Sequence, residues 1–167
     1  MKYKFGLLVC FIVTPAFAQS LCTADETVVF TCQAKAKVVS ACASKDVSPH
    51  GGYLQFRIGQ GNATEISYPA SRTRTANVVT FGYAGMDMGP PGHYVMLVDG
   101  PDTYGIITTD DRGPQYGGEE SAFVRQRDGK TVDSLVCDQL TSPTDAGLDL
   151  LDKAGFKNVD SDALNLP

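Results

Sequence analysis

Nine short runs of β-branched and aromatic residues follow one another along this 167-residue chain, separated by Gly, Pro, Asn and Asp. Such runs, bounded by turn residues, are typical of β-strands in an all-β domain. The expected strands are residues 27–32, 37–43, 53–59, 64–68, 76–83, 93–98, 104–109, 122–127 and 131–137. Polar residues alternate with apolar ones at positions 53–58, which predicts one buried and one solvated face. We expect an antiparallel meander of about 8 to 9 strands.

Short turn sequences predict which strands are neighbours. Asp-Gly at positions 128–129 is typical of a type I′ hairpin, because both residues must adopt positive φ. This turn would pair Arg127 with Lys130 and set Phe123 opposite Ser134. Two further hairpins are expected at residues 59–62 and 99–102. Short connections imply antiparallel neighbours, either in a barrel or in a sandwich.

The N-terminus has the pattern of an exported bacterial protein. Two lysines precede an apolar stretch at residues 5–13, and Ala-Phe-Ala at 16–18 offers a cleavage site, so we interpret residues 1–18 as a signal peptide. The apolar stretch is shorter than the roughly 20 residues that cross a bilayer. Cys10 follows a valine, which is larger than the residue that precedes a lipidated cysteine. We expect one periplasmic or secreted domain at residues 19–167, without a membrane anchor.

The charge balance limits the partners of this chain. Residues 1–18 contain two lysines and no acidic residue, so the mature chain has 12 basic and 19 acidic residues and a net charge of −7. An acidic surface repels nucleic acid and attracts a basic protein. We therefore expect no nucleic-acid partner.

Four cysteines remain in the mature chain, and an even number in an oxidising compartment predicts two disulfides. Their spacings include no C-x-x-C pair and no neighbouring histidines, which fits a zinc site poorly. No metal or other cofactor is expected from them.

Strand register predicts how the cysteines pair. A hairpin turn about Lys35 would set Cys32 opposite Val38 and Val28 opposite Cys42. Cys32 and Cys42 would then lie about 13 Å apart at roughly 3.3 Å per residue, too far for a bridge. The incoming segment around Cys22 would pass near the end of the second strand, so the expected disulfides are Cys22–Cys42 and, for the remaining two cysteines, Cys32–Cys137. The second would tie the first strand to the last, which slightly favours a closed barrel over a sandwich.

The composition changes after the last cysteine. Residues 142–145, with the sequence Ser-Pro-Thr-Asp, offer a helix cap and a proline, and Gly155 stands where a helix would end. Leu148 and Leu151 form an apolar stripe at helical spacing. We expect a short helix at about residues 143–155 that packs on the β domain.

Residues for catalysis are sparse. His50 and His93 lie among glycines and prolines, as solvated histidines in loops commonly do. The expected disulfides would occupy all four cysteines of the mature chain, which removes the strongest nucleophile. We expect no catalytic residues and no enzymatic activity.

Four acidic residues flank one long loop between two expected strands: Asp110, Asp111, Glu119 and Glu120. Converging carboxylates could bind Ca²⁺, but their spacing matches no known calcium motif. A solvated loop is the simplest interpretation. The alternative is an electrostatic contact with a basic protein, because long loops on a β scaffold often carry binding residues.

A second candidate contact surface surrounds several glycines and prolines. It comprises Met86, Asp87, Met88 and Tyr94. Methionine repacks readily and tyrosine is favoured at interfaces, so these residues could contact a partner. Packing within the loop would explain the same composition.

Three early segments carry a resemblance to known proteins. They are residues 29–32, with an aromatic-x-Cys pattern, residues 38–44 and residues 53–59. Together they resemble small bacterial periplasmic β proteins, many of them uncharacterised. With Cys137, they are more distantly similar to the periplasmic inhibitors of C-type lysozyme. That resemblance implies a small β-barrel that inserts loop residues into the cleft of an enzyme, and it assigns a role to no particular residue here.

These features predict a non-catalytic envelope protein that binds another protein. An inhibitor or immunity factor against a basic cell-wall hydrolase or toxin fits an acidic, disulfide-braced scaffold, since complementary charge steers association. One alternative is a small-ligand or metal-binding barrel with an internal cavity. The other is a structural envelope component that assembles through an exposed strand edge.

Overall fold

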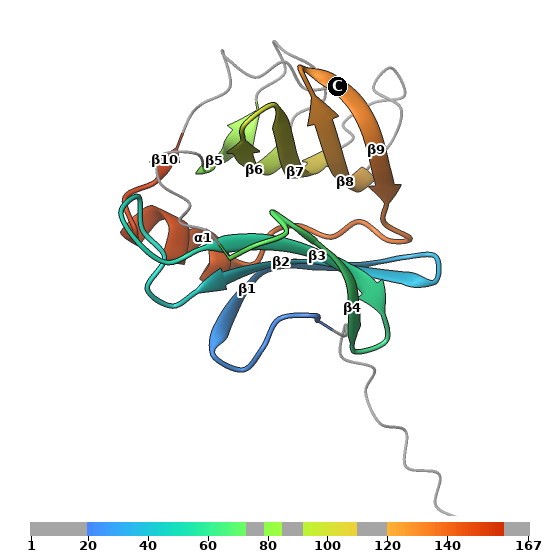
Figure 1. The fold of residues 1–167 in the computed structure, drawn as a ribbon, viewed down its shortest axis with the longest axis horizontal. Coiled ribbons are helices and arrows are strands. Elements are labelled where there is room, and N and C mark those ends of the chain that lie inside the picture. The colour runs from blue at the N-terminus through green and yellow to red at the C-terminus, as the bar shows by residue number, and fades with distance from the viewer. Residues whose placement is uncertain (1–19, 73–78, 85–91, 110–119, 159–167) are drawn as a thin grey trace, which may run out of the picture.

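Strands dominate the computed structural model, which describes residues 20–72, 79–84, 92–109 and 120–158. In these residues the strands form two sheets that face each other, with one short helix at the side (Figure 1). The expected all-β fold with a short C-terminal helix is therefore confirmed. The expected signal peptide at residues 1–18 lies outside the described residues.

The first sheet is a four-stranded antiparallel meander in the order β1-β2-β3-β4. Its strands are β1 (Glu26–Ala34), β2 (Lys37–Ser44), β3 (Leu54–Gln60) and β4 (Ala63–Tyr68). All four lie where the runs of β-branched and aromatic residues predicted them.

The second sheet has six strands in the order β10-β5-β6-β7-β8-β9. Its strands are β5 (Val79–Ala84), β6 (Gly92–Asp99), β7 (Asp102–Thr109), β8 (Glu120–Arg127), β9 (Lys130–Val136) and β10 (Lys157–Asn158). β10 pairs with β5 in parallel and was not predicted, because two residues are too short to show a pattern.

The two sheets form a sandwich, so the slight preference for a closed barrel was wrong. β1 and β9 belong to different sheets, and the disulfide Cys32–Cys137 connects the sheets. After Cys137 the chain runs along the outer edge of β1 without forming a strand. The Asp138 amide donates to the Gln33 carbonyl (2.7 Å), and the Lys35 amide donates to the Asp138 carboxylate (2.9 Å).

The core lies between the sheets and is filled by large side chains. Phe56 of the first sheet contacts Phe123 of the second, with ring centroids 5.8 Å apart. Tyr68 stacks on Tyr104 at 4.8 Å and on Phe123 at 5.8 Å. Because aromatic pairs bury much apolar area, they hold the two layers together.

The registers confirm part of the hairpin predictions. Both residues of the turn at 128–129 have positive φ (51° and 72°), and the residues flanking the turn pair as expected. Phe123, however, faces Leu135 rather than Ser134, because a β-bulge in β9 adds one residue.

The first hairpin is shifted by one residue at its tip, because its turn occupies residues 35–36 and is not centred on Lys35. Cys32 pairs with Val39 rather than with the predicted Val38. A bulge in β1 then removes the shift, so that Val28 faces Cys42 as predicted. The three bulge residues of the described sheets all lie in strands at a sheet edge: Val29 in β1, Glu65 in β4 and Val132 in β9.

Helix α1 (Asp145–Lys153) packs on β1 and lies within the predicted range. The hydroxyl of Thr144 accepts from the Gly147 amide (3.0 Å) and donates to the Val28 carbonyl (2.6 Å). The Thr144 amide donates to the carbonyl of the bulge residue Val29 (2.7 Å). The β1 bulge therefore anchors the start of the helix, and Leu151 of the helix joins the core.

Candidate functional site

The outer face of the first sheet, which points away from the second sheet, carries buried polar groups. Leu54, Phe56 and Ile58 of β3 face the core, so Gln55 and Arg57 face outward. Both outward side chains are nevertheless buried, each with 4% of its surface exposed. The predicted solvated face at this strand was therefore wrong.

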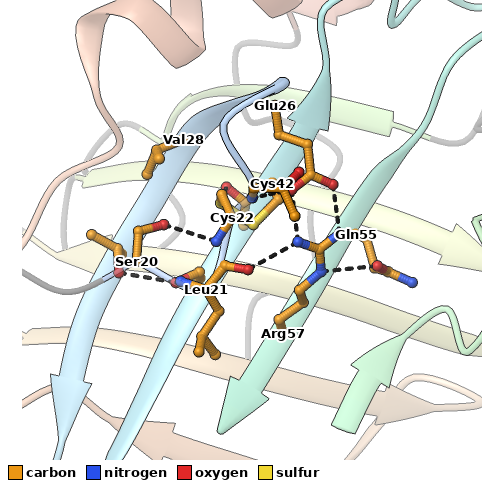
Figure 2. The surroundings of a disulfide bond; sticks show 12 residues. Ser20, Leu21, Cys22, Glu26, Val28, Cys42, Gln55 and Arg57 are labelled. Carbon is orange, nitrogen blue, oxygen red and sulfur yellow. Dashed lines mark hydrogen bonds and ion pairs between the residues drawn. A yellow bond between two sulfur atoms is a disulfide. The ribbon is translucent and has the colours of Figure 1, made fainter. Parts of the chain in front are cut away.

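The segment of residues 20–23 covers this face (Figure 2). The Cys22–Cys42 disulfide ties the segment to β2, and the Leu21 amide donates to the buried hydroxyl of Ser40 (3.0 Å). The Thr23 amide donates to the Glu26 carboxylate (2.6 Å). We call residues 20–23 the N-terminal strap.

Beneath the strap, Arg57 and Glu26 form a buried ion pair. The side chain of Arg57 is 4% exposed and that of Glu26 is 0% exposed. Two guanidinium nitrogens, Nη1 and Nη2, donate to the two carboxylate oxygens at 2.7 and 2.5 Å. Nη1 also donates to the Leu21 carbonyl (2.9 Å), and Nε donates to Gln55 Oε1 (3.0 Å), as Figure 2 shows. The pair thus connects the strap to β1 and β3.

Hydrogen bonds decide the protonation of this pair. Burial by itself would raise the pKa of Glu26, but donors from Arg57, Tyr53 and Thr23 outweigh it and hold the pKa at about 2. Burial would lower the pKa of Arg57, but the hydrogen bond and charge of Glu26 raise it. Both groups are therefore charged at neutral pH.

A hollow of about 580 Å³ lies beside the ion pair on this outer face. It is bounded by the strap, by β3 and β4 with the turn between them, and by the segment after β4, and we call it the outer hollow. Its lining residues are Ser20, Leu21, Cys22, Thr23, Gln55, Arg57, Asn62, Thr64, Ser67, Ala70 and Arg72. Most of these side chains are polar, and the volume falls within the range of ligand sites in proteins.

Arg72 is the exposed cation of the outer hollow. Its side chain is 51% exposed, and its Nη2 lies 3.8 Å from Glu26 Oε1. Its guanidinium carbon stands 5.1 Å from the ring centroid of Tyr53, a cation–π arrangement. The hydroxyl of Tyr53 in turn donates to Glu26 Oε1 (2.6 Å). One carboxylate therefore organises both arginines.

The disulfides agree with the sequence predictions. Cys22–Cys42 has a Cα–Cα distance of 5.3 Å, and Cys32–Cys137 has one of 5.8 Å. Cys22, Cys42 and Glu26 lie close together, but sulfurs joined in a disulfide supply no thiolate for a metal.

The structure describes only two of the residues predicted to bind a partner. Glu120 is exposed at the start of β8. Tyr94 was predicted to belong to an exposed contact surface, but it lies in β6 and is fully buried. Outside the described residues lie Asp110, Asp111, Glu119, Met86, Asp87 and Met88.

Sequence reasoning missed Glu26, Arg57 and Arg72. The one available signal was the Cys22–Cys42 pair, since a bridge from Cys22 to the outward-facing Cys42 requires the preceding chain to cross the outer face. No local pattern marks a buried arginine in a strand that alternates normally.

Comparison with family models finds no match, and neither curated proteins nor solved structures show a match. Within the described residues, no helix has the length and apolar character needed to cross a membrane. Two disulfides are typical of a protein that folds in an oxidising compartment outside the cytoplasm.

Proposed function

We propose that this chain is a non-catalytic envelope protein, periplasmic or secreted, that binds another protein. The role we propose is that of an inhibitor or immunity factor against an enzyme that degrades the cell wall. The observation that carries the proposal is the outer hollow, a polar recess beside an ion pair in which both groups stay charged near neutral pH.

The charged groups of the outer hollow suit binding better than proton transfer. A general acid or base works best with a pKa near the operating pH. The pKa of Glu26 is about 2, and that of Arg57 is raised from an already high value. These groups can fix the position of a partner but are poorly suited to exchanging protons with it.

A protein partner fits the surroundings of the hollow. Ala63, Thr64 and Glu65 of β4 are exposed beside it, so the recess continues into an open strand surface. The disulfides hold the strap and the two sheets in place before any partner arrives. A pre-organised surface loses less conformational entropy on binding, which favours affinity. The net charge of −7 expected for residues 19–167 would also steer a basic enzyme toward the protein.

Capture of a partner tests this proposal. The chain would be expressed in full, purified in its oxidised, exported form and immobilised, then exposed to envelope extracts and to basic wall hydrolases at low and high salt. We expect a specific hydrolase to bind, to dissociate at high salt, and to lose turnover when bound. Failure of every wall hydrolase to bind at low salt would overturn the proposal, as would binding that leaves turnover unchanged.

A small anionic ligand is the second candidate for the outer hollow. The volume of about 580 Å³ and the presence of Arg72 favour it. The predicted alternative placed such a ligand inside a barrel, whereas this hollow lies on the outside of a sandwich. A ligand that copurifies with the chain and is displaced by small carboxylic acids would support this candidate.

A further inference from the structure

We propose that the outer hollow binds a carboxylate through the guanidinium of Arg72, and that this carboxylate comes from the protein partner. The source of the carboxylate rests on the proposed function, whereas the chemistry of the hollow does not. Three properties of the hollow carry the inference: its charge balance, the orientation of Arg72, and the donors around it.

The charge balance leaves one positive charge uncompensated. Among the described residues, Arg57 and Arg72 line the hollow, and Glu26 lies under both. Arg57 and Glu26 neutralise each other through their paired hydrogen bonds. The residues that line the hollow, together with Glu26, therefore carry one net positive charge, that of Arg72, on a chain whose expected net charge without residues 1–18 is −7. The hollow is locally attractive to an anion that the rest of the surface repels.

Arg72 is oriented without saturating its hydrogen-bond donors. Its Nη2 lies 3.8 Å from Glu26 Oε1, which is beyond hydrogen-bonding distance, and the Tyr53 ring supports its guanidinium from one side. Hydrogen bonds are the main cause that lowers the pKa of Asp25, and the charge of the nearby Arg72 lowers it further. Solvent screens the interaction between these two exposed groups. The guanidinium can thus offer N–H groups to a ligand from a defined position.

Neutral donors also line the hollow. Thr64 and Ser67 contribute hydroxyl groups, and neither hydroxyl bonds to another residue in the part of the chain that the structure describes. The side-chain amide of Gln55 donates through Nε2 to the Pro69 carbonyl (2.9 Å), which fixes the segment that leads to Arg72. A guanidinium and hydroxyl donors that line the same hollow suit an oxyanion.

A carboxylate fits better than a phosphate. A phosphate monoester carries a charge of about −1.5 to −2 at neutral pH, which one uncompensated arginine does not balance next to Glu26. A carboxylate carries one negative charge, and its planar fork matches a guanidinium in a bidentate pair. The hollow therefore selects a single carboxylate.

Calorimetric titration of the oxidised, exported chain tests this inference. The probes are a short neutral peptide with a free C-terminal carboxylate, the same peptide amidated, acetate, and inorganic phosphate. We expect the free peptide to bind roughly tenfold or more tightly than its amidated form, equivalent to about 1.4 kcal/mol. Phosphate should bind more weakly than the free peptide. Equal affinity for the two peptides, or tighter binding of phosphate, would contradict the inference.

Variants assign the effect to Arg72. Because this side chain is half-exposed, Arg72→Gln should fold normally and lose the preference for the free carboxylate, and Arg72→Lys should restore only part of it. The matched control is Lys130→Gln, which removes one exposed positive charge from β9, in the other sheet. An unchanged preference in Arg72→Gln, or an equal loss in Lys130→Gln, would overturn the inference.

The same variants separate this inference from the proposed function. If Arg72→Gln captures the hydrolase as well as the native chain does, the carboxylate inference fails and the proposed function stands. If peptide carboxylate binds through Arg72 but no protein is captured, the proposed function fails and the carboxylate site stands. Acetate that binds as tightly as the peptide would show that the hollow serves a small acid, which removes the partner as the source.

Discussion

Glu26 and Arg57 meet on the outer face of the first sheet, where both side chains are almost fully removed from water. Desolvation of two charges is costly, and a buried ion pair recovers that cost only with good geometry and further hydrogen bonds. Here Tyr53, Thr23, Gln55 and the Leu21 carbonyl supply those bonds. The strap supplies hydrogen bonds that stabilise the buried ion pair, and the ion pair in turn holds the strap on the sheet.

Removal of one partner should be strongly destabilising. Glu26→Gln leaves Arg57 buried without a counter-charge, and we expect the free energy of unfolding to fall by about 3 to 5 kcal/mol. Urea denaturation measures the change. The same substitution in the exposed pair of Lys37 and Glu65, Glu65→Gln, should cost less than about 1 kcal/mol. Similar losses in the two variants would show that the buried pair contributes no more than a surface pair.

The pKa of Glu26 predicts how stability responds to acid. Its pKa falls from an ordinary value of 4.5 to about 2 on folding, so the unfolded chain binds the proton more readily. The contribution of Glu26 is fully present above pH 4.5 and is lost as the pH falls toward 2. Urea denaturation between these pH values should show a shallower slope for Glu26→Gln than for the native chain. Some slope should remain, because the pKa of Asp102 is also lowered, chiefly by its hydrogen bond from Arg127.

The sequence predicted the residues of this site unevenly. Strand register excluded a bridge between Cys32 and Cys42, and the expected path of the segment around Cys22 then predicted Cys22–Cys42, which the structure contains. Arg57 was assigned to a solvated face, because alternation along a strand shows which residues share a face but not what covers it. The cover consists of residues 20–23, which have no regular secondary structure and therefore no periodic signal.

Bulges interrupt the edge strands of both sheets. β4 and β9 are exposed edge strands, and each contains one extra residue, Glu65 or Val132. A bulge twists an edge and interrupts its row of hydrogen-bonding groups, which disfavours pairing with another strand. Assembly through these edges is therefore less favourable than it would be for regular strands.

The third bulge, at Val29 of β1, contacts helix α1. Gly147 shows how closely the helix approaches this bulge. A Cβ on Gly147 would lie 2.5 Å from the Val29 Cα and 2.8 Å from the Thr144 hydroxyl. Gly147→Ala should therefore destabilise the protein by about 1 to 3 kcal/mol, although alanine is the better helix former. Thermal denaturation measures the effect.

A helix substitution on the exposed side provides the control. Asp149→Ala also improves helix propensity and removes only an exposed pair with Lys153. It should leave stability within about 0.5 kcal/mol of the native value. Stabilisation by Gly147→Ala would mean that α1 does not pack this tightly on β1.

The two disulfides act on different parts of the whole molecule. Cys32–Cys137 closes a loop of 105 residues between the sheets, and Cys22–Cys42 closes one of 20 residues on the outer face. In the chain-entropy model these loops contribute about 4.7 and about 3 kcal/mol. Paired alanine substitutions should therefore destabilise the protein more when they remove the long loop, as measured by urea denaturation. Only loss of the short loop should weaken carboxylate binding, because Cys22 anchors the strap.

Architecture at this scale was harder to predict than the strands themselves. Each strand has a local pattern, whereas barrel and sandwich differ only in whether β4 pairs with β5 and β1 with β9. The bridge from Cys32 to Cys137 suits both architectures. The segment after Cys137 lies along the edge of β1, and its Asp138 and Thr144 amides donate to carbonyls of that strand. Such irregular pairing has no sequence pattern from which it could be predicted.

The placement of Cys32 and Cys42 on opposite faces of the first sheet also favours correct pairing of the cysteines. In a chain that is exported N-terminus first, Cys22, Cys32 and Cys42 reach the oxidising compartment before Cys137, so until Cys137 arrives Cys32 has only wrong partners. Once β1 and β2 pair, Cys32 points into the core while Cys42 points outward beneath the strap. The hairpin thereby separates Cys32 from the two early thiols, and the strap captures Cys42. We therefore expect Cys137 to meet Cys32 in its reduced form, so that no incorrect bridge has to be broken first.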